Sequence, residues 1–418
     1  MKNKAILWRS TRGKSPLVTL EQAFLSGLAP DGGLYVPEVF PFYEWDSFEG
    51  IHTVHEIAEK ILRPFFIHSS LEPELHNICK YAFNFSIPLL QKTPKISVLE
   101  WFHGPTAAFK DTGARFLAQC LSRLENAQER SVWVATSGDT GGAVASAFSE
   151  TQIPVVILFP EGKVSDAQRE QLVGWKKPIL SIEVAGDFDD CQRILKEAMS
   201  TYPEKITTSN SVNVGRLLAQ MCVFSAASLW NIRKYQKFAH FVIPTGNLGN
   251  GLSALWAKQM GFPIAKVTFA TNQSSPLKQY FKTKNWEPKN SVSTLASAMD
   301  VGAPSNFERL IDLFRPIDLL FQSHDVFQSS DERIQKTISE VHQLTGEWVC
   351  PHTACAWDAA QTISHPTIVV ATAHPGKFKT VVPKAEDYPK KSLFEGRKDN
   401  SIVVISAKLS EILKKVPL

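Results

Sequence analysis

Residues 241–255 read Phe-Val-Ile-Pro-Thr-Gly-Asn-Leu-Gly-Asn-Gly-Leu-Ser-Ala-Leu, and this segment decides the fold. Its first three residues form an apolar run typical of a buried strand, and residues 252–255 have the apolar spacing of a helix. Between them, Gly246, Gly249 and Gly251 let backbone N–H groups converge on an anion at the start of that helix. The segment matches neither the Walker A loop nor the Gly-x-Gly-x-x-Gly dinucleotide motif. It predicts a phosphate-binding turn in an α/β fold, or a glycine-rich turn that serves only tight packing.

Outward from this segment, short apolar runs alternate with helical periods. The runs that read as strands are Val132–Ala135, Val155–Phe159, Ile179–Val184, Val267–Ala270 and Ile368–Val370. The segments that read as helices are 142–148, 165–173 and 191–199. Runs that are apolar throughout indicate a parallel sheet covered by helices on both faces. Because ligands bind beyond the carboxyl ends of strands in such sheets, we expect the site at the turns that follow them.

The composition excludes several classes of protein. The chain has 418 residues, of which 44% are hydrophobic and 21% charged, and its net charge of +4 is dispersed, so disorder and a nucleic-acid-binding tail are not expected. No apolar segment approaches a signal peptide or a membrane span, which predicts a cytoplasmic protein. The six scattered cysteines fit a reducing compartment. Cys350-Pro-His352-Thr-Ala-Cys355 invites a metal site, but it lacks a second ligand pair, so no metal is expected.

A second motif, His103-Gly-Pro-Thr-Ala-Ala-Phe-Lys-Asp-Thr112, places Lys110 at the start of an amphipathic helix that ends near residue 124. We expect Asp111 to cap this helix. Burial of a lysine at a helix N-terminus favours the neutral amine, which is the form that attacks a carbonyl carbon. The motif also fits a solvated lysine at an ordinary helix start.

Three further polar turns follow predicted strands. The first contains Ser137, Gly138, Asp139 and Thr140, whose hydroxyl and amide groups suit a carboxylate or a phosphate. The second supplies Asn210 and Arg216, an amide and a guanidinium that suit a phosphate monoester. The third begins with Thr372 and leads into His374-Pro-Gly-Lys377. Each turn also fits an ordinary helix cap or surface turn.

Together and in this order, these motifs resemble the threonine synthase family, which are pyridoxal-phosphate enzymes of the tryptophan-synthase β-like (fold type II) class. The similarity extends from Asp31-Gly-Gly-Leu-Tyr-Val36 to His374-Pro-Gly-Lys-Phe378. It implies an α/β fold with two doubly wound, mostly parallel sheets and a small N-terminal domain. The domains expected are residues 1–92 (the N-terminal domain), 93–235 (the catalytic lysine and a smaller, mobile α/β domain) and 236–418 (the larger α/β domain with the phosphate turn).

The resemblance also implies roles for individual residues. Lys110 would form the Schiff base with pyridoxal 5'-phosphate and remove the substrate Cα proton. Asp139 falls where many relatives contact the 3'-oxygen of the cofactor, and the Thr372 hydroxyl would meet its pyridine nitrogen. The cofactor phosphate would be held by Gly246, Asn247, Leu248, Gly249 and Asn250. The substrate would be bound by Ser137, Gly138, Thr140, Asn210 and Arg216.

The reaction implied is the conversion of O-phospho-L-homoserine and water to L-threonine and phosphate, carried out by a monomer or a homodimer. A related phospho-lyase or a threonine dehydratase is an alternative within the same fold, and its products would be a 2-oxo acid and ammonia. A non-catalytic relative that only binds an anionic metabolite would have lost Lys110 or the glycine turn, and both are present.

Overall fold

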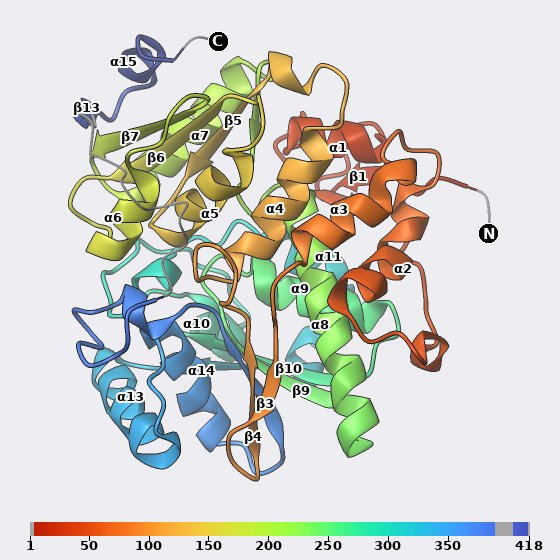
Figure 1. Cartoon of the computed structure of the whole chain (residues 1–418), viewed down its shortest axis with the longest axis vertical. Coiled ribbons are helices and arrows are strands. Elements are labelled where there is room, and N and C mark those ends of the chain that lie inside the picture. The colour runs from red at the N-terminus through yellow and green to blue at the C-terminus, as the bar shows by residue number, and fades with distance from the viewer. Residues whose placement is uncertain (1–3, 389–403, 417–418) are drawn as a thin grey trace.

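A computed structural model describes residues 4–388 and 404–416. It places two largely parallel sheets one above the other, each with helices on both faces, and a small N-terminal region at one side (Figure 1). The mixed α/β architecture expected from the alternating apolar runs is therefore confirmed.

The larger sheet has the strand order β11-β10-β9-β12-β4-β3, and only the β3–β4 pair is antiparallel. Its strands are β3 (Leu89–Gln91), β4 (Ile96–Glu100), β9 (Ala239–Pro244), β10 (Ile264–Thr271), β11 (Asp325–Gln328) and β12 (Thr367–Ala371). Alternate residues of β9 enter different cores: Phe241 packs on the side of α8 (Val214–Tyr235) and α9 (Gly249–Gln259). Val242 packs on the side of α14 (Pro351–Gln361) and α13 (Asp331–Thr345). Burial of both faces explains why these strands are apolar throughout.

The smaller sheet has the order β13-β7-β6-β5-β8 and is parallel throughout. Its strands are β5 (Ser131–Ala135), β6 (Val155–Pro160), β7 (Ile179–Ala185), β8 (Ile206–Thr208) and β13 (Val404–Ser406). The helices that accompany it are α4 (Lys110–Leu121), α5 (Asp139–Phe148), α6 (Asp166–Leu172), α7 (Phe188–Thr201) and α15 (Leu409–Leu413). Val132 and Trp133 of β5 again enter different cores, so this sheet is also buried on both faces.

The N-terminal region consists of a two-stranded antiparallel ribbon and short helices. The ribbon pairs β1 (Trp8–Ser10) with β2 (Tyr35–Pro37). The helices are α1 (Leu20–Ser26), α2 (Val54–Phe66) and α3 (Leu75–Ala82). Both α1 and α2 begin with a capping box, formed by Thr19 with Gln22 and by Thr53 with Glu56.

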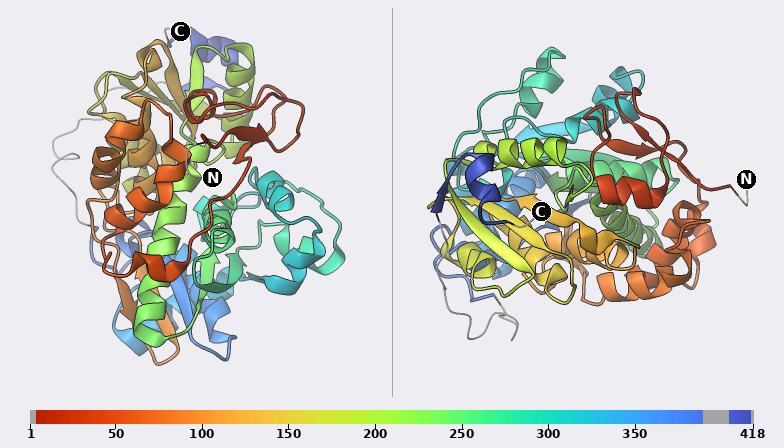
Figure 2. Two further views of the ribbon diagram at one scale, coloured as in Figure 1. Left: turned by 90° about the vertical axis from the view of Figure 1, so that its right-hand side faces the viewer. Right: turned by 90° about the horizontal axis from the view of Figure 1, so that it is seen from above.

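One long helix, α8, joins the two halves of the molecule. It packs against α2, α4 and α9 (Figure 2) and is buried along most of its length, which matches a sequence with apolar or small residues on every side. The remaining helices, α10 (Leu277–Thr283), α11 (Phe307–Leu313) and α12 (Asp318–Ser323), lie between β10 and β11 in the sequence. No helix in the described ranges is long and apolar enough to span a membrane.

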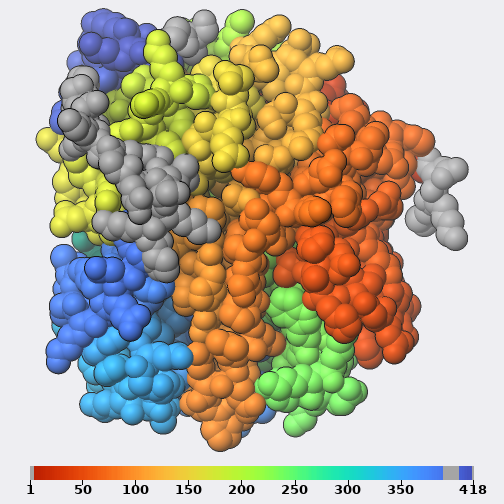
Figure 3. Space-filling model, viewed as in Figure 1, coloured from red at the N-terminus to blue at the C-terminus, as the bar shows by residue number. Residues whose placement is uncertain are grey.

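Each sheet includes at least one strand that is far in the sequence from the other strands of that sheet. β3 and β4, which precede the smaller sheet, pair with the larger one, and they lie in the orange band of Figure 3. β13, near the C-terminus, pairs with β7 of the smaller sheet. Strand pairing thus crosses between the segments 93–235 and 236–418 in both directions, and the domain boundaries remain a prediction.

Candidate active site

The polar turns of both sheets meet at one cavity. It lies beyond the carboxyl ends of β5, β8, β9 and β12, where an open α/β sheet binds its ligand. The predicted site residues that line it are Lys110, Ser137, Asp139, Thr140, Asn210, Arg216, Gly246, Asn247, Gly249, Asn250 and Thr372. Two predicted residues, Gly138 and Leu248, instead shape the turns beside it, as the N-cap residues of α5 and α9.

Lys110 is held in place by the backbone that follows β12, at Thr372 and His374. The Phe109 N–H donates to the Thr372 carbonyl at 2.9 Å, and the His374 N–H donates to the Ala107 carbonyl at 3.0 Å. Ala107 has a φ of 54°, a left-handed conformation that a residue with a side chain adopts only under constraint. These contacts fix the start of α4 against the end of β12, so that Lys110 enters the cavity at a defined point.

The prediction that Asp111 caps α4 is wrong. The helix begins at Lys110 with Phe109 as its N-cap residue, so Asp111 lies in the first turn. Its carboxylate instead accepts hydrogen bonds from the Thr106 N–H at 2.9 Å and the Thr106 hydroxyl at 2.7 Å. A Cβ at Gly104 would come within 2.5 Å of this carboxylate, so the loop closes only around a glycine. Asp111 therefore shapes the loop that precedes Lys110.

The Lys110 amine is poised to act as a base. Its Nζ donates to the Thr140 hydroxyl at 3.0 Å, which connects α4 to α5. Burial lowers the pKa of Lys110 to about 8, and the positive charges of Arg216 and Lys377 act in the same direction, against the attraction of Asp139. About a tenth of the amine is therefore neutral at pH 7 and about half at pH 8, a shift in the direction that the motif predicted.

The glycine turn after β9 forms a tight cradle. Leu248 is left-handed, with a φ of 62°, and the N–H groups of Gly249 and Asn250 have no acceptor within α9, whereas the Gly251 N–H donates to the Asn250 Oδ1 at 2.9 Å. A Cβ at Gly246 would lie 2.7 Å from the Met299 Cα, so only a glycine fits there. The Asn250 side chain donates to the Pro244 carbonyl and accepts from the Thr245 hydroxyl. The asparagine thus stiffens the turn and leaves backbone groups to meet an anion.

Asn210 and Arg216 both line the cavity, but their side chains have different hydrogen-bond partners. The Asn210 amide exchanges two hydrogen bonds with the backbone of Ala135, at 2.7 and 3.1 Å, and so fixes the end of β5. Arg216 is buried and donates to the carbonyls of Ser209 and Lys110. Its Nε has no hydrogen-bond partner and lies against Gly113 of α4, where a Cβ would come within 2.7 Å of it, while Arg216 as a whole lines the cavity.

Two functional candidates were missed in the sequence. Lys377 is fully buried and pairs with Asp139 at 2.7 Å, and His352 lines the cavity and accepts from the Ala298 N–H through Nε2 at 3.1 Å. Burial lowers the pKa of His352 to about 4, so the ring is neutral. Lys377 could have been found from its position in the turn that starts at Thr372, which was already considered part of the site. His352 lay in the segment considered for metal, whose cysteines, Cys350 and Cys355, are buried free thiols.

The sequence of this chain is similar to those of known pyridoxal-phosphate enzymes. The family profile for pyridoxal-phosphate-dependent enzymes matches residues 90–376, and the profile for the threonine synthase N terminus matches residues 7–83. A threonine synthase from Haemophilus influenzae is 35% identical over 378 residues, which cover 87% of this chain and 88% of the relative.

The chain belongs to the threonine synthase family.

Other threonine synthases agree with this conclusion. The one from Escherichia coli is 33% identical over 375 residues, 87% of each chain. Its crystal structure superimposes with a TM-score of 0.90 and 30% identity, covering 98% of this chain and 99% of that chain. The structure of threonine synthase with bound pyridoxal phosphate from Brucella melitensis gives a TM-score of 0.85 at 29% identity, covering 98% of each chain. The fold class and the cofactor expected from the sequence, fold type II and pyridoxal 5'-phosphate, are confirmed.

The residues of the cavity fit pyridoxal phosphate. A buried amine, a glycine cradle at a helix N-terminus and a strand-end hydroxyl supply the partners that its aldehyde, phosphate and ring nitrogen require. The Arg216 guanidinium, which also lines the cavity, provides a positive charge for a second anion there.

Proposed function

We propose that the chain is a lyase that converts O-phospho-L-homoserine and water to L-threonine and phosphate. The observation that carries the proposal is the position of the Lys110 amine in one cavity with two anion-binding groups, the glycine cradle after β9 and the Arg216 guanidinium. The reaction needs two phosphate sites, one for the cofactor and one for the substrate. Alternatives without a substrate phosphate need only the first.

Pyridoxal phosphate supplies an electron-withdrawing ring that stabilises negative charge on the carbon next to the substrate nitrogen. The cradle of Gly246, Asn247, Leu248, Gly249 and Asn250 would hold its phosphate, and the Asp139 carboxylate would lie near its 3'-oxygen. The Thr372 hydroxyl would face the pyridine nitrogen. A neutral hydroxyl does not keep a proton on that nitrogen as a carboxylate does, so the ring withdraws electrons more mildly.

Lys110 would move the protons of the reaction. As a neutral amine it takes a proton from Cα and then one from Cβ of the substrate, and protons are returned at Cγ and Cα. The C–O bond at Cγ breaks and releases phosphate, and the hydroxyl of water is added at Cβ. The net change is the gain of one water and the loss of phosphate, which leaves a methyl group at Cγ and a hydroxyl group at Cβ.

The remaining residues would bind the substrate. Arg216 would hold its phosphate through the guanidinium charge, and the turn of Ser137, Gly138 and Thr140 at the start of α5 would take its carboxylate or phosphate. Asn210 would contribute to the phosphate site chiefly by fixing the end of β5, because its amide is engaged by Ala135. The location in the cytoplasm, as a monomer or a homodimer, stays a prediction.

The test compares the wild-type protein with Lys110→Ala and with Lys234→Ala, which alters an exposed lysine at the end of α8. Wild type and Lys234→Ala should be yellow, should retain the cofactor covalently after borohydride reduction, and should form threonine and phosphate in equal amounts from O-phosphohomoserine. Lys110→Ala should show none of these three properties. Phosphate accompanied by a 2-oxo acid and ammonia would favour the phospho-lyase, and the absence of covalent cofactor in the wild type would contradict the role of Lys110.

A further inference from the structure

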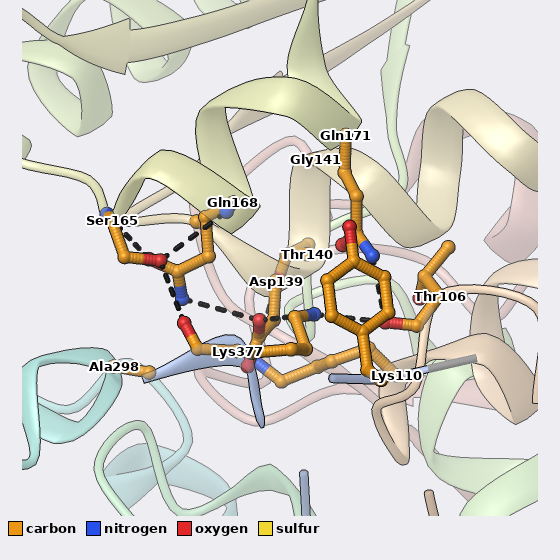
Figure 4. A network of polar contacts seen from close by, with 12 residues as sticks. Thr106, Lys110, Asp139, Thr140, Gly141, Ser165, Gln168, Gln171, Ala298 and Lys377 are labelled. Atoms are coloured by element: carbon orange, nitrogen blue, oxygen red, sulfur yellow. Dashed lines mark hydrogen bonds and ion pairs between the residues drawn. The ribbon is translucent and has the colours of Figure 1, made fainter. Parts of the chain in front are cut away.

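A buried ion pair lies beside the catalytic lysine. Lys377 has a side chain that is 0% exposed, and its Nζ lies 2.7 Å from the Oδ1 of Asp139. The same Nζ donates to the Thr106 carbonyl at 2.8 Å (Figure 4). The turn that carries Lys377 (residues 375–377) follows β12, whereas Asp139 begins α5, so the pair connects the two halves of the cavity.

Both partners are fixed by further contacts. The Gln168 amide of α6 donates to Asp139 at 3.1 Å, and the Ser165 hydroxyl donates to the Lys377 carbonyl at 3.1 Å (Figure 4). The carboxylate is therefore held toward Lys377 and Gln168. An ion pair is retained in such a buried place only when its geometry offsets the loss of hydration.

The cavity has an excess of positive charge before any anion binds. Lys110 of α4 and Arg216 of α8 line it together with the carboxylate of Asp139, and Lys377 pairs with that carboxylate beside the cavity. His352 of α14 is neutral, and Asp111 is occupied by Thr106. An unpaired Asp139 would be attracted to whichever cation is nearest and free to move, and Lys110 is one of them.

We propose that Lys377 is a positioning residue that holds the Asp139 carboxylate and thereby prevents it from pairing with Lys110. Lys110 must lose its proton to react with the cofactor aldehyde, and an ion pair with a carboxylate would hold the proton on it. Lys377 thus pairs with the Asp139 carboxylate, which would otherwise pair with Lys110 and keep its amine protonated. The inference rests on the role of Lys110 in the proposed function.

The electrostatics agree with this arrangement. Lys377 lowers the pKa of Asp139 to about 2, against the effect of burial, so the carboxylate stays charged. Lys377 also lowers the pKa of Lys110 by repulsion, whereas Asp139 raises it. Replacement of Lys377 by methionine removes the repulsion and releases the carboxylate. Both changes raise the pKa of Lys110, and a carboxylate within about 4–6 Å shifts a pKa by about 1–3 units.

The experiment measures the attachment of the cofactor as a function of pH. Full-length protein is freed of cofactor and mixed with pyridoxal 5'-phosphate. Samples taken at short times are reduced with borohydride, and the pyridoxyl group on the Lys110 peptide is counted by mass spectrometry. In the wild type, the initial rate should rise through a midpoint near pH 8, the pKa of Lys110. In Lys377→Met the midpoint should move up by about one pH unit or more.

Two comparisons separate this role from a structural one. Lys379→Met makes the same change two residues later, at an exposed side chain paired with Asp387, and should leave the midpoint unchanged. Because Lys377 acts largely through Asp139, the shift caused by Lys377→Met should fall to half or less when Asp139→Asn is already present. The double variant also lacks an unpaired buried charge, so it remains informative if Lys377→Met alone folds poorly.

The outcomes are distinct. A midpoint in Lys377→Met equal to that of the wild type would overturn the inference, as would an equal shift in the Asp139→Asn background. If the wild type itself attaches no cofactor at Lys110, the proposed function fails first and the inference with it.

Discussion

Arg216 carries a buried charge whose Nε has no hydrogen-bond partner in the protein. We predict that Arg216→Ala lowers kcat/KM for O-phosphohomoserine by about 10- to 100-fold, since a hydrogen bond to a charged group contributes about 1.5–3 kcal/mol. The visible spectrum of the bound cofactor should not change, because the cradle after β9 does not depend on this side chain. Arg233→Ala, at the other end of α8, should leave kcat/KM at the wild-type value. A loss of cofactor binding in Arg216→Ala would place the arginine in the cofactor site instead.

At the scale of residues, the sequence indicated the members of the site whose chemistry is carried by a short motif. Lys110 was predicted as a site residue from its motif, in which it follows Phe109. Thr372 was predicted from its position directly after an apolar strand. Asp111 was misassigned because a carboxylate in the first turn of a helix suits an N-cap, and only the folded loop shows that it bonds to Thr106 instead. Lys377 was not predicted as a site residue, because its partner, Asp139, is more than two hundred residues away in the chain.

Gly104 belongs to the loop that delivers Lys110 to the cavity. We predict that Gly104→Ala lowers the free energy of unfolding by about 1–3 kcal/mol, because the new Cβ meets the Asp111 carboxylate in a packed loop. The rate of cofactor attachment at Lys110 should fall as well, since the loop sets the position of the lysine. Gly162→Ala is the control: its Cβ meets open space, and only its positive φ costs about 1 kcal/mol. Equal attachment rates in the two variants would show that the loop does not position the lysine.

At the scale of elements, the central strands were predicted well and the edge strands were not. β6, β9 and β12 lie where continuous apolar runs were seen, because both of their faces are buried. β8, β11 and β13 are three or four residues long and stand at sheet edges, so their sequences carry too little pattern to be distinguished from loops. Their pairing depends on the sheet that is already present.

Over the whole molecule, buried neutral histidines make stability depend on pH. Burial lowers the pKa of His240 and of His324 to about 4 in the folded protein, below the ordinary value of 6.5. The unfolded chain therefore binds more protons between these values, so stability is fully present above about pH 6.5 and falls as the pH drops toward 4. We predict that the free energy of unfolding in urea falls by at least about 2 kcal/mol from about pH 7.5 to about pH 5.

A single substitution checks the source of this dependence. His324 accepts from the Val267 N–H through Nδ1 at 3.2 Å, and the amide oxygen of an asparagine can take over that role without titrating. His324→Asn should therefore show a smaller loss of stability over the same pH interval. An unchanged slope in this variant would assign the acid sensitivity to other groups.

The attachment of Lys110 to the end of β12 has a consequence for the order in which the protein is made. On a ribosome that adds about 5–20 residues per second, Lys110 is synthesised roughly 10 to 50 seconds before Thr372, whose carbonyl accepts from Phe109. β4 is likewise synthesised that long before β12, the strand with which it pairs in parallel. A nascent chain that has not reached this strand carries Lys110 without the cavity, so we expect specific attachment of the cofactor at Lys110 to begin only after Thr372 has been synthesised.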